Sequence, residues 1–217
     1  MAGRLDGMRI AILATSGVEQ VELADPRDAV TAEGARTEIV SLDDGEIQAT
    51  NQDINPADTF RVDRTASAAD PGDYQALLMP GGTVNADRLR MDPDVQAFVR
   101  AFFEAGKPVA AICHAPWTLI DAGVVRGRTL TSFPSLRTDI ENAGGTWVDE
   151  EVHVDQGLVT SRKPGRPSGL QREDDRGVRR GRARGPKGVR RDGLLTGAIE
   201  RRHPPRAFSS AAAFFTA

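Results

Sequence analysis

The sequence predicts an α/β protein with a doubly wound, mostly parallel sheet and helices on both faces of that sheet. Short apolar runs at 9–15, 37–42, 75–82 and 107–113 alternate with segments of helical spacing. The run at 9–15 ends at Ser16-Gly17, the run at 75–82 ends in a double glycine, and the run at 107–113 stops at Cys113-His114. Such runs are typical of strands buried on both faces of a parallel sheet.

The segments between these strands carry helix signals. Residues 20–33 have apolar side chains at helical spacing, and Pro26 predicts a start at Val21 or later, because proline fits the first turn of a helix. Residues 92–106 form an amphipathic pattern with Asp92 as N-cap and Pro93 in the first position. Further expectations are helices at 115–123 and 134–144, a strand at 129–133, a minor hairpin within 43–74 and a hairpin at 146–162.

Composition excludes several classes of protein. The chain has 217 residues, of which 39% are hydrophobic and 27% charged, as is usual for a globular protein. No window reaches about 18 uninterrupted apolar residues, so we expect no membrane span. The first residues lack an apolar signal-peptide core, which favours the cytoplasm. The single cysteine, Cys113, excludes an internal disulfide and a multi-cysteine zinc site.

The net charge of −3 is unevenly distributed along the chain. Residues 1–164 carry 15 Lys and Arg against 26 Asp and Glu, whereas residues 165–217 carry 13 against 5. We therefore expect one acidic α/β domain over 1–164 and a basic, disordered tail over 165–217. A basic arm of this kind is one alternative basis for function, through nucleic-acid binding.

Three features fall at the carboxyl edge of the predicted sheet, where ligands bind in folds of this class. Cys113 follows a buried strand and precedes a helix, so its side chain points out of the edge like the nucleophile of a hydrolase elbow. The loop 16–20 follows the first strand, and Gly81 and Gly82 follow the third. The three features are expected to meet.

These residue types suit nucleophilic catalysis. A helix starting near Cys113 favours the thiolate, so we expect an acidic thiol. His114 is the expected general acid or base, and Glu19 the expected hydrogen-bond partner of the thiol. The predicted oxyanion- or substrate-binding residues are Gly81, Gly82 and Ala115.

Each residue also has a structural interpretation. A lone cysteine is most often a small buried hydrophobe, and a glycine pair is most often a turn. Glu19 alone is typical of a solvated carboxylate at a helix start. His153 lies in the predicted hairpin and is interpreted as a surface histidine.

The combination of motifs resembles the PfpI-type intracellular cysteine protease/deglycase family of the class I glutamine amidotransferase-like superfamily. The resemblance covers about 8–164 and rests on SGVEQVEL, LLMPGG, the elbow AAICHAPW and the closing VTSR. It implies a flavodoxin-like fold, homo-dimers or hexamers, and a role as protease, deglycase or stress protein. Cys113 matches the family's nucleophile, His114 its neighbouring histidine, and Glu19 the carboxylate beside the cysteine. The resemblance implies no metal or organic cofactor.

The resemblance is lost after Pro164. The family continues with D-D-L-P-A-F and a closing helix, whereas this chain reads GRPSGL at 165–170. The degenerate codons for those six residues, read one nucleotide later, can encode D-D-L-P-A-F. We therefore expect a single-nucleotide insertion near codon 165, with out-of-frame translation beyond it.

Three function classes follow. The first is a cytoplasmic, cysteine-dependent hydrolase that acts on a peptide or on glycated or aldehyde-modified proteins and small molecules. The second is a redox or stress sensor, or a chaperone, that uses Cys113 without turnover. The third, nucleic-acid binding through the basic tail, predicts salt-dependent binding that is lost on truncation at Pro164.

Overall fold

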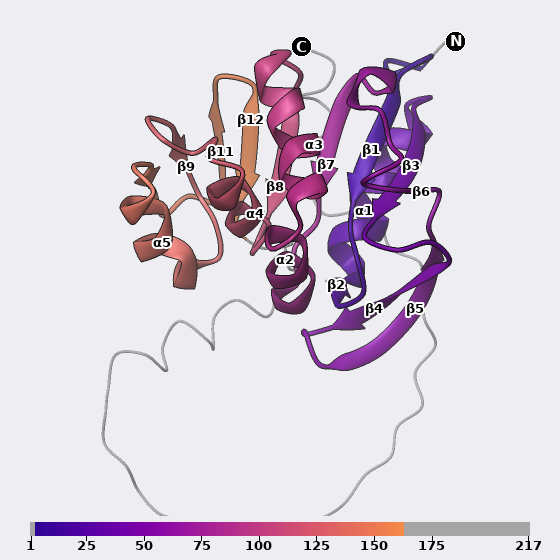
Figure 1. Ribbon diagram of the computed structural model, residues 1–217, viewed down its shortest axis with the longest axis horizontal. Helices are drawn as coiled ribbons and strands as arrows, with labels where there is room; N and C mark the ends of the chain where they lie inside the picture. Colours follow the sequence, from indigo (N-terminus) through magenta and orange to yellow (C-terminus); the bar gives the residue numbers. More distant parts are fainter. Residues whose placement is uncertain (1–2, 163–217) are drawn as a thin grey trace, which may run out of the picture.

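The computed structural model describes residues 3–162, and Figure 1 shows their arrangement. The expectation of a basic, disordered tail at 165–217 lies outside the described residues. The expected division into an α/β domain at 1–164 and a tail at 165–217 stays a prediction.

A seven-stranded sheet forms the centre of the molecule, in the order β11-β12-β8-β7-β1-β3-β6. All neighbouring pairs are parallel except β11 and β12, which form an antiparallel hairpin. The strands are β1 (Arg9–Leu13), β3 (Arg36–Ser41), β6 (Arg64–Thr65), β7 (Ala76–Met79), β8 (Val109–Ile112), β11 (Val152–Asp155) and β12 (Leu158–Ser161). The predicted flavodoxin-like, doubly wound, mostly parallel sheet is confirmed.

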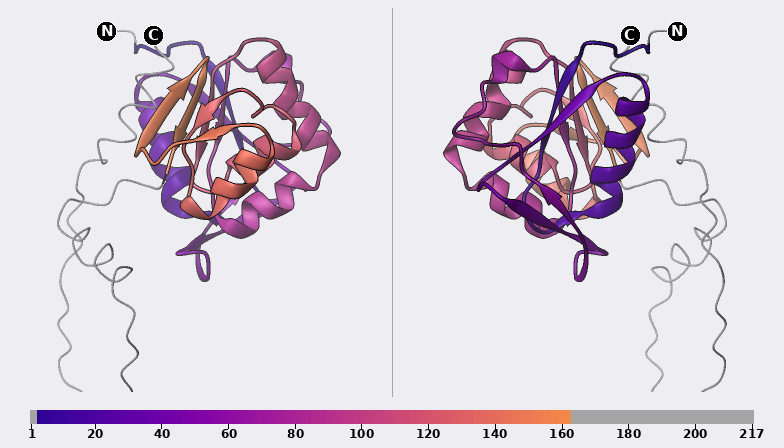
Figure 2. Two further views of the ribbon diagram at one scale, coloured as in Figure 1. Left: turned by 90° about the vertical axis from the view of Figure 1, so that its left-hand side faces the viewer. Right: turned by 90° about the vertical axis from the view of Figure 1, so that its right-hand side faces the viewer.

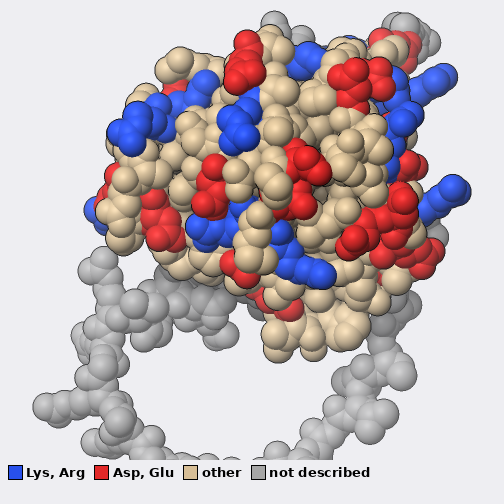
Figure 3. Space-filling view, viewed as in Figure 1, with Lys and Arg blue, Asp and Glu red and all other residues tan. Residues whose placement is uncertain are grey.

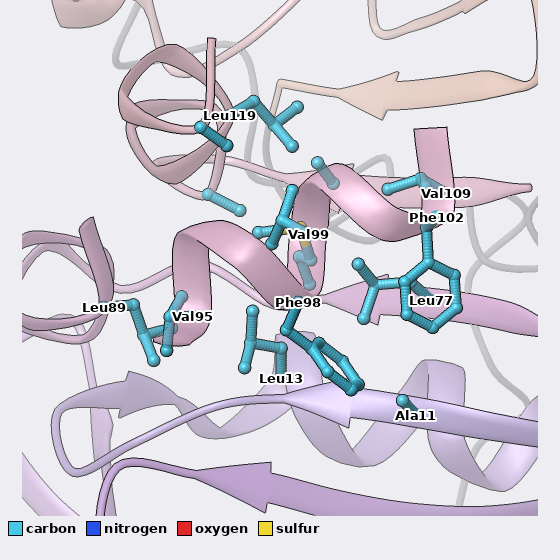
Figure 4. Close-up of a cluster of buried hydrophobic side chains, with 14 of the residues drawn as sticks. Ala11, Leu13, Leu77, Leu89, Val95, Phe98, Val99, Phe102, Val109 and Leu119 are labelled. Carbon is cyan, nitrogen blue, oxygen red and sulfur yellow. The ribbon is translucent and has the colours of Figure 1, made fainter. Parts of the chain in front are cut away.

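Helices cover both faces of this sheet, as expected. Helix α1 (Gln20–Ala32) packs on one face, and α2 (Thr83–Arg90), α3 (Pro93–Glu104), α4 (Pro116–Asp121) and α5 (Arg137–Asn142) lie on the other (Figure 2). Strand β1 shows why its sequence is apolar throughout. Ala11 and Leu13 pack with Phe98 of α3 (Figure 4), whereas Ile10 and Ile12 belong to the cluster beneath α1.

Two small sheets flank the central one. One comprises β2 (Val18–Glu19), β4 (Glu46–Asn51) and β5 (Asn55–Arg61), and the β4–β5 pair is the hairpin expected within 43–74. The other pairs β9 (Thr129–Leu130) with β10 (Thr146–Trp147). Short 3₁₀ turns lie at η1 (Pro71–Asp73) and η2 (Pro134–Leu136).

Two helices differ from the expectations. Helix α2 was not expected at all, and helix α1 begins earlier relative to Pro26 than expected. The segment that forms α2 is polar, and only Asn85, Ala86 and Leu89 are buried, so its apolar spacing is too sparse to indicate a helix. Pro26 lies in the interior of α1 rather than in its first turn. Its ring is buried, so packing offsets the backbone hydrogen bond that proline cannot make.

Candidate active site

Cys113 lies on a sharp turn between β8 and α4, as the elbow motif predicts. Its φ angle is 58°, a left-handed conformation that costs a non-glycine residue on the order of 1 kcal/mol or more. Two backbone hydrogen bonds hold it there: its N–H donates to Ser161 O at 2.9 Å, and its carbonyl accepts from Phe133 N at 2.9 Å. The residue is only 8% exposed. The sulfur is therefore fixed by the fold at the carboxyl edge of the sheet.

A buried carboxyl group from α1 contacts this sulfur. Glu22 is 1% exposed and is hydrogen-bonded to the Cys113 thiol. Its Oε2 also accepts a hydrogen bond from Gly81 N at 2.8 Å. A Cβ added to Gly81 would lie 2.5 Å from Glu22 Oε2 and 2.8 Å from Cys113 Cβ, so only glycine lets the three residues approach.

Glu19 does not take the place that the sequence analysis gave it. Its carboxylate accepts hydrogen bonds from Gln52 N at 3.1 Å and Asp53 N at 3.2 Å, at the tip of the β4–β5 hairpin. Glu22, about one helical turn further along, contacts the sulfur instead. Glu19 lies in β2, immediately before α1, whereas Glu22 lies in the first turn of that helix on its buried side. A sequence motif with two glutamates three residues apart does not distinguish them.

His114 lies beside the nucleophile and is held from both sides. Its Nδ1 is 3.2 Å from Cys113 Sγ, and its Nε2 is 3.5 Å from Ser135 Oγ. The imidazole stacks on the Phe133 ring at a centroid distance of 4.6 Å and contacts Trp117 at 5.4 Å. Ser135 and Phe133 were missed from the sequence because they reach the site from a separate segment, η2 and the residue before it.

The backbone amides near the sulfur divide into occupied and free groups. Gly81 N donates to Glu22, and Ala115 N donates to Ile112 O at 2.9 Å, so neither is available to a substrate. Within residues 3–162, Gly82 N has no hydrogen-bond acceptor, and the N–H of His114 points to the Cys113 sulfur. Of the three predicted oxyanion residues, only Gly82 keeps a free amide.

Burial dominates the protonation of this site. It raises the pKa of Glu22 from 4.5 to about 8, so the carboxyl holds a proton at neutral pH. Burial, followed by the charge and hydrogen bond of Glu22, also raises the pKa of the Cys113 thiol. Burial lowers the pKa of His114, against the charge of Asp53, so the imidazole is neutral at neutral pH.

The direction at Cys113 corrects the expectation of an acidic thiol. Helix α4 has only six residues, so its dipole is small, and the N–H of His114 opposes the raised pKa only in part. The thiol proton therefore needs an acceptor within the site. His114 Nδ1, 3.2 Å away, is positioned to accept it.

The comparisons with known proteins agree with the fold and the motifs. Residues 8–173 match the DJ-1/PfpI family. The chain belongs to the DJ-1/PfpI family. Deglycase PfpI of Pyrococcus furiosus and deglycase TK1284 of Thermococcus kodakarensis are each 39% identical over 158 residues, which cover 73% of this chain and 92% of the relative. Protein/nucleic acid deglycase 2 of Escherichia coli is 38% identical over 157 residues, 72% of this chain and 89% of the relative.

Solved structures show the same fold. The DJ-1/ThiJ/PfpI-like and ferritin-like two-domain protein of Anabaena variabilis has a TM-score of 0.68 and 32% identity, covering 73% of this chain and 44% of that one. DJ-1 of Schizosaccharomyces pombe has a TM-score of 0.62 and 21% identity, covering 71% and 83% of the two chains.

Two classes of feature are absent from the described residues. Residues 3–162 contain no group of three His, Cys, Asp or Glu side chains placed to hold a metal ion. Within the same range, no helix is both long enough and apolar enough to cross a membrane.

Proposed function

We propose that this DJ-1/PfpI family protein is a cysteine-dependent hydrolase of the PfpI type, with Cys113 as its nucleophile. One observation carries the proposal: the strained elbow holds the Cys113 sulfur between a protonated Glu22 and the imidazole of His114. A structural cysteine requires neither the strain nor these two partners. Relatives named as deglycases support a carbonyl adduct on a protein or small molecule as the substrate, and a peptide is the alternative.

The first step uses the contact between the sulfur and His114. The thiol proton passes to Nδ1, and the thiolate attacks the carbonyl carbon of the substrate, forming a C–S bond while the carbonyl π electrons move to oxygen. The protonated carboxyl of Glu22 hydrogen-bonds the sulfur without adding a negative charge. Because burial disfavours charge on all three groups, the resting site is neutral, and charge develops only during the reaction.

The second step uses the free amide of Gly82 and the amide of His114, which in the resting site is hydrogen-bonded to the Cys113 sulfur. The N–H groups of Gly82 and His114 stabilise the oxyanion, since the amides of Gly81 and Ala115 are occupied. With an amide substrate, the tetrahedral intermediate collapses, the C–N bond breaks and His114 returns its proton to the departing amine. With a methylglyoxal hemithioacetal, C1 passes from the bound thiol to the Cys113 sulfur, the free thiol leaves, and transfer of the C1 proton to C2 gives the thioester. Water then cleaves the thioester, with His114 as general base.

The remaining expectations concern the compartment, the assembly and the nucleic-acid binding of the protein. Cytoplasmic residence and assembly into homo-dimers or hexamers remain proposals that follow from the family. Nucleic-acid binding depends on the tail at 165–217, outside the described residues. On the face shown in Figure 3, basic and acidic side chains are mixed, without the basic stripe that nucleic-acid binding favours.

The test is turnover by the full chain on two substrate classes. One is the methylglyoxal adduct of N-acetylcysteine, followed by release of the free thiol, and the other is a chromogenic peptide amide. We expect Cys113→Ala to abolish turnover and His114→Ala to lower kcat by about 10²- to 10⁴-fold. His153→Ala is the matched control, because His153 is paired with Glu150 on the β11 hairpin, away from the sulfur.

Two results would contradict the proposal. Turnover that survives in Cys113→Ala would show that the sulfur is not the nucleophile. Loss of turnover in His153→Ala equal to that in His114→Ala would show that the histidine effect is not local. Absence of turnover on both substrates, together with reversible oxidation of Cys113, would favour the sensor function instead.

A further inference from the structure

Asp53 joins three parts of the molecule around the site. It lies at the tip of the β4–β5 hairpin in a left-handed conformation, with φ 63°. Its N–H donates to Glu19 Oε2, and its own Oδ1 accepts a hydrogen bond from Thr83 N at 2.7 Å. Thr83 is the first residue of α2, a helix whose N-cap residue is Gly82 and has no side chain. Asp53 therefore caps this helix from a distant part of the chain.

This cap places a negative charge next to the free amide proposed for the oxyanion. Thr83 N and Gly82 N belong to consecutive peptide units. The Asp53 carboxylate, 2.7 Å from Thr83 N, therefore lies close to the Gly82 amide. The charge is felt by the reacting groups, since Asp53 acts electrostatically on Cys113, Glu22 and His114. A carboxylate at this distance favours positive charge and opposes negative charge in whatever binds there.

The charged groups around the site are negative. The charged side chains that act on Cys113, Glu22 and His114 are all carboxylates, and Glu22 itself is neutral through its proton. Within residues 3–162, no arginine or lysine is among the groups with the largest effect on these three. A substrate with its own carboxylate or phosphate would enter against Asp53, whereas an amine or guanidinium would be attracted.

We propose that Asp53 is a specificity-determining residue, which makes the site select neutral and cationic carbonyl substrates over anionic ones. The inference rests on the proposed function, because it concerns what reaches the Cys113 sulfur. It adds a discrimination by charge: adducts near a positive or an uncharged group are favoured over adducts that carry an acid near the carbonyl.

The structural and electrostatic roles of Asp53 can be separated by one substitution. In Asp53→Asn the side-chain oxygen can still accept the hydrogen bond from Thr83 N, and asparagine tolerates the left-handed conformation. The variant loses the charge and keeps the cap. Asp92→Asn is the matched control, because Asp92 Oδ1 caps α3 in the same way, at 2.9 Å from Val95 N, and does not act on the three site residues.

The experiment measures the labelling rate of Cys113 with two methanethiosulfonates of similar size. One carries a trimethylammonium group and the other a sulfonate. In each case the thiolate attacks the sulfenyl sulfur, a disulfide forms and methanesulfinate leaves. Cys113 is the only cysteine of the chain, so the label reports on this site alone. The ratio of the cationic to the anionic rate cancels any change in the acidity of the thiol.

We expect the cationic reagent to react faster in the wild-type protein, after each rate is divided by that with free N-acetylcysteine. Asp53→Asn should lower this ratio by about three- to tenfold, and Asp92→Asn should leave it unchanged. The wild-type ratio should also fall as the ionic strength rises from about 0.01 M to about 1 M, since the Debye length shrinks from about 30 Å to about 3 Å.

The outcomes are separable. A wild-type ratio near one, or a ratio that is the same in Asp53→Asn as in the wild type, overturns the inference while leaving the nucleophile intact. Failure of both reagents to label Cys113 in the native protein overturns the proposed function and this inference with it. If Asp53→Asn does not fold, the salt dependence of the wild-type ratio decides, and a ratio independent of salt overturns the inference.

Discussion

The carboxyl group of Glu22 and the thiol of Cys113, 91 positions apart in the sequence, share a hydrogen bond inside the protein. Both groups are almost completely buried, so neither can gain a charge cheaply. The Gly81 N–H, 2.8 Å from Glu22 Oε2, fixes the carboxyl from a third direction. Much of the behaviour of the site with pH and mutation follows from this contact.

The first prediction concerns the stability of the protein as a function of pH. Glu22 has a pKa of about 8 in the folded protein and 4.5 as its ordinary value. The folded state therefore binds more protons between these values, and the free energy of unfolding falls as the pH rises from about 4.5 to about 8. The loss is on the order of a few kcal/mol. Urea unfolding across this range should show the decline, and Glu22→Gln should remove it.

An ion pair elsewhere in the protein provides the control for this measurement. Asp121 pairs with Arg90 on the surface of α4, so Asp121→Asn should leave the decline with pH in place. An equal decline in the wild type and in Glu22→Gln would show that another group is responsible.

The second prediction concerns Gly81. Alanine there would place Cβ 2.5 Å from Glu22 Oε2 and 2.7 Å from Ile112 O, and the carbonyl is fixed in the chain. We expect Gly81→Ala to lower the free energy of unfolding by about 1–3 kcal/mol or more. Gly45→Ala is the comparison, because Gly45 has φ +100° and open space around it, so its cost of roughly 1–2 kcal/mol is purely conformational. A Gly81→Ala protein of wild-type stability would mean that Glu22 does not lie against this loop.

The third prediction separates Glu19 from Glu22. Glu19→Ala removes the acceptor for the amides of Gln52 and Asp53, so hydrogen exchange of these two amides should accelerate. Glu19→Gln should restore much of their protection, since one side-chain oxygen remains. The pH profile of Cys113 alkylation should change more in Glu22→Gln than in either variant at Glu19. The reverse order would place Glu19 at the sulfur after all.

The fourth prediction concerns the reading frame. The family match ends at residue 173 and leaves 174–217 outside it. We expect deletion of one nucleotide at codon 165 to restore D-D-L-P-A-F with a closing helix. A net gain of about 2 kcal/mol would then raise Tm by roughly 4–8 °C. A chain truncated after Pro164 should have the same Tm as the unaltered protein. Should that shorter chain be less stable by several kcal/mol, residues 165–217 would be structural and the insertion hypothesis would fail.

The apolar runs predicted the parallel strands well, because strands buried on both faces leave few choices of side chain. The elbow was predicted equally well, since the strand that ends at Ile112 and the helix that begins at Pro116 place Cys113 on a sharp turn between them. Helix α2 was missed because its buried side chains, Asn85, Ala86 and Leu89, form no apolar pattern. Glu22 and Asp53 were missed because their roles depend on how distant segments meet, and no local spacing records that meeting.

The backbone of Cys113 depends for its support on a strand that comes later in the sequence. Its N–H is bonded to Ser161 O in β12, the last strand that the structure describes, and β12 is also the neighbour of β8 in the sheet. During synthesis, which proceeds from the N-terminus, β8 emerges before the strand that must pair with it. The growing polypeptide therefore carries the nucleophile, the histidine and both glutamates well before the turn can lock. The arrangement of these groups around the sulfur is therefore complete only once β12 has paired with β8.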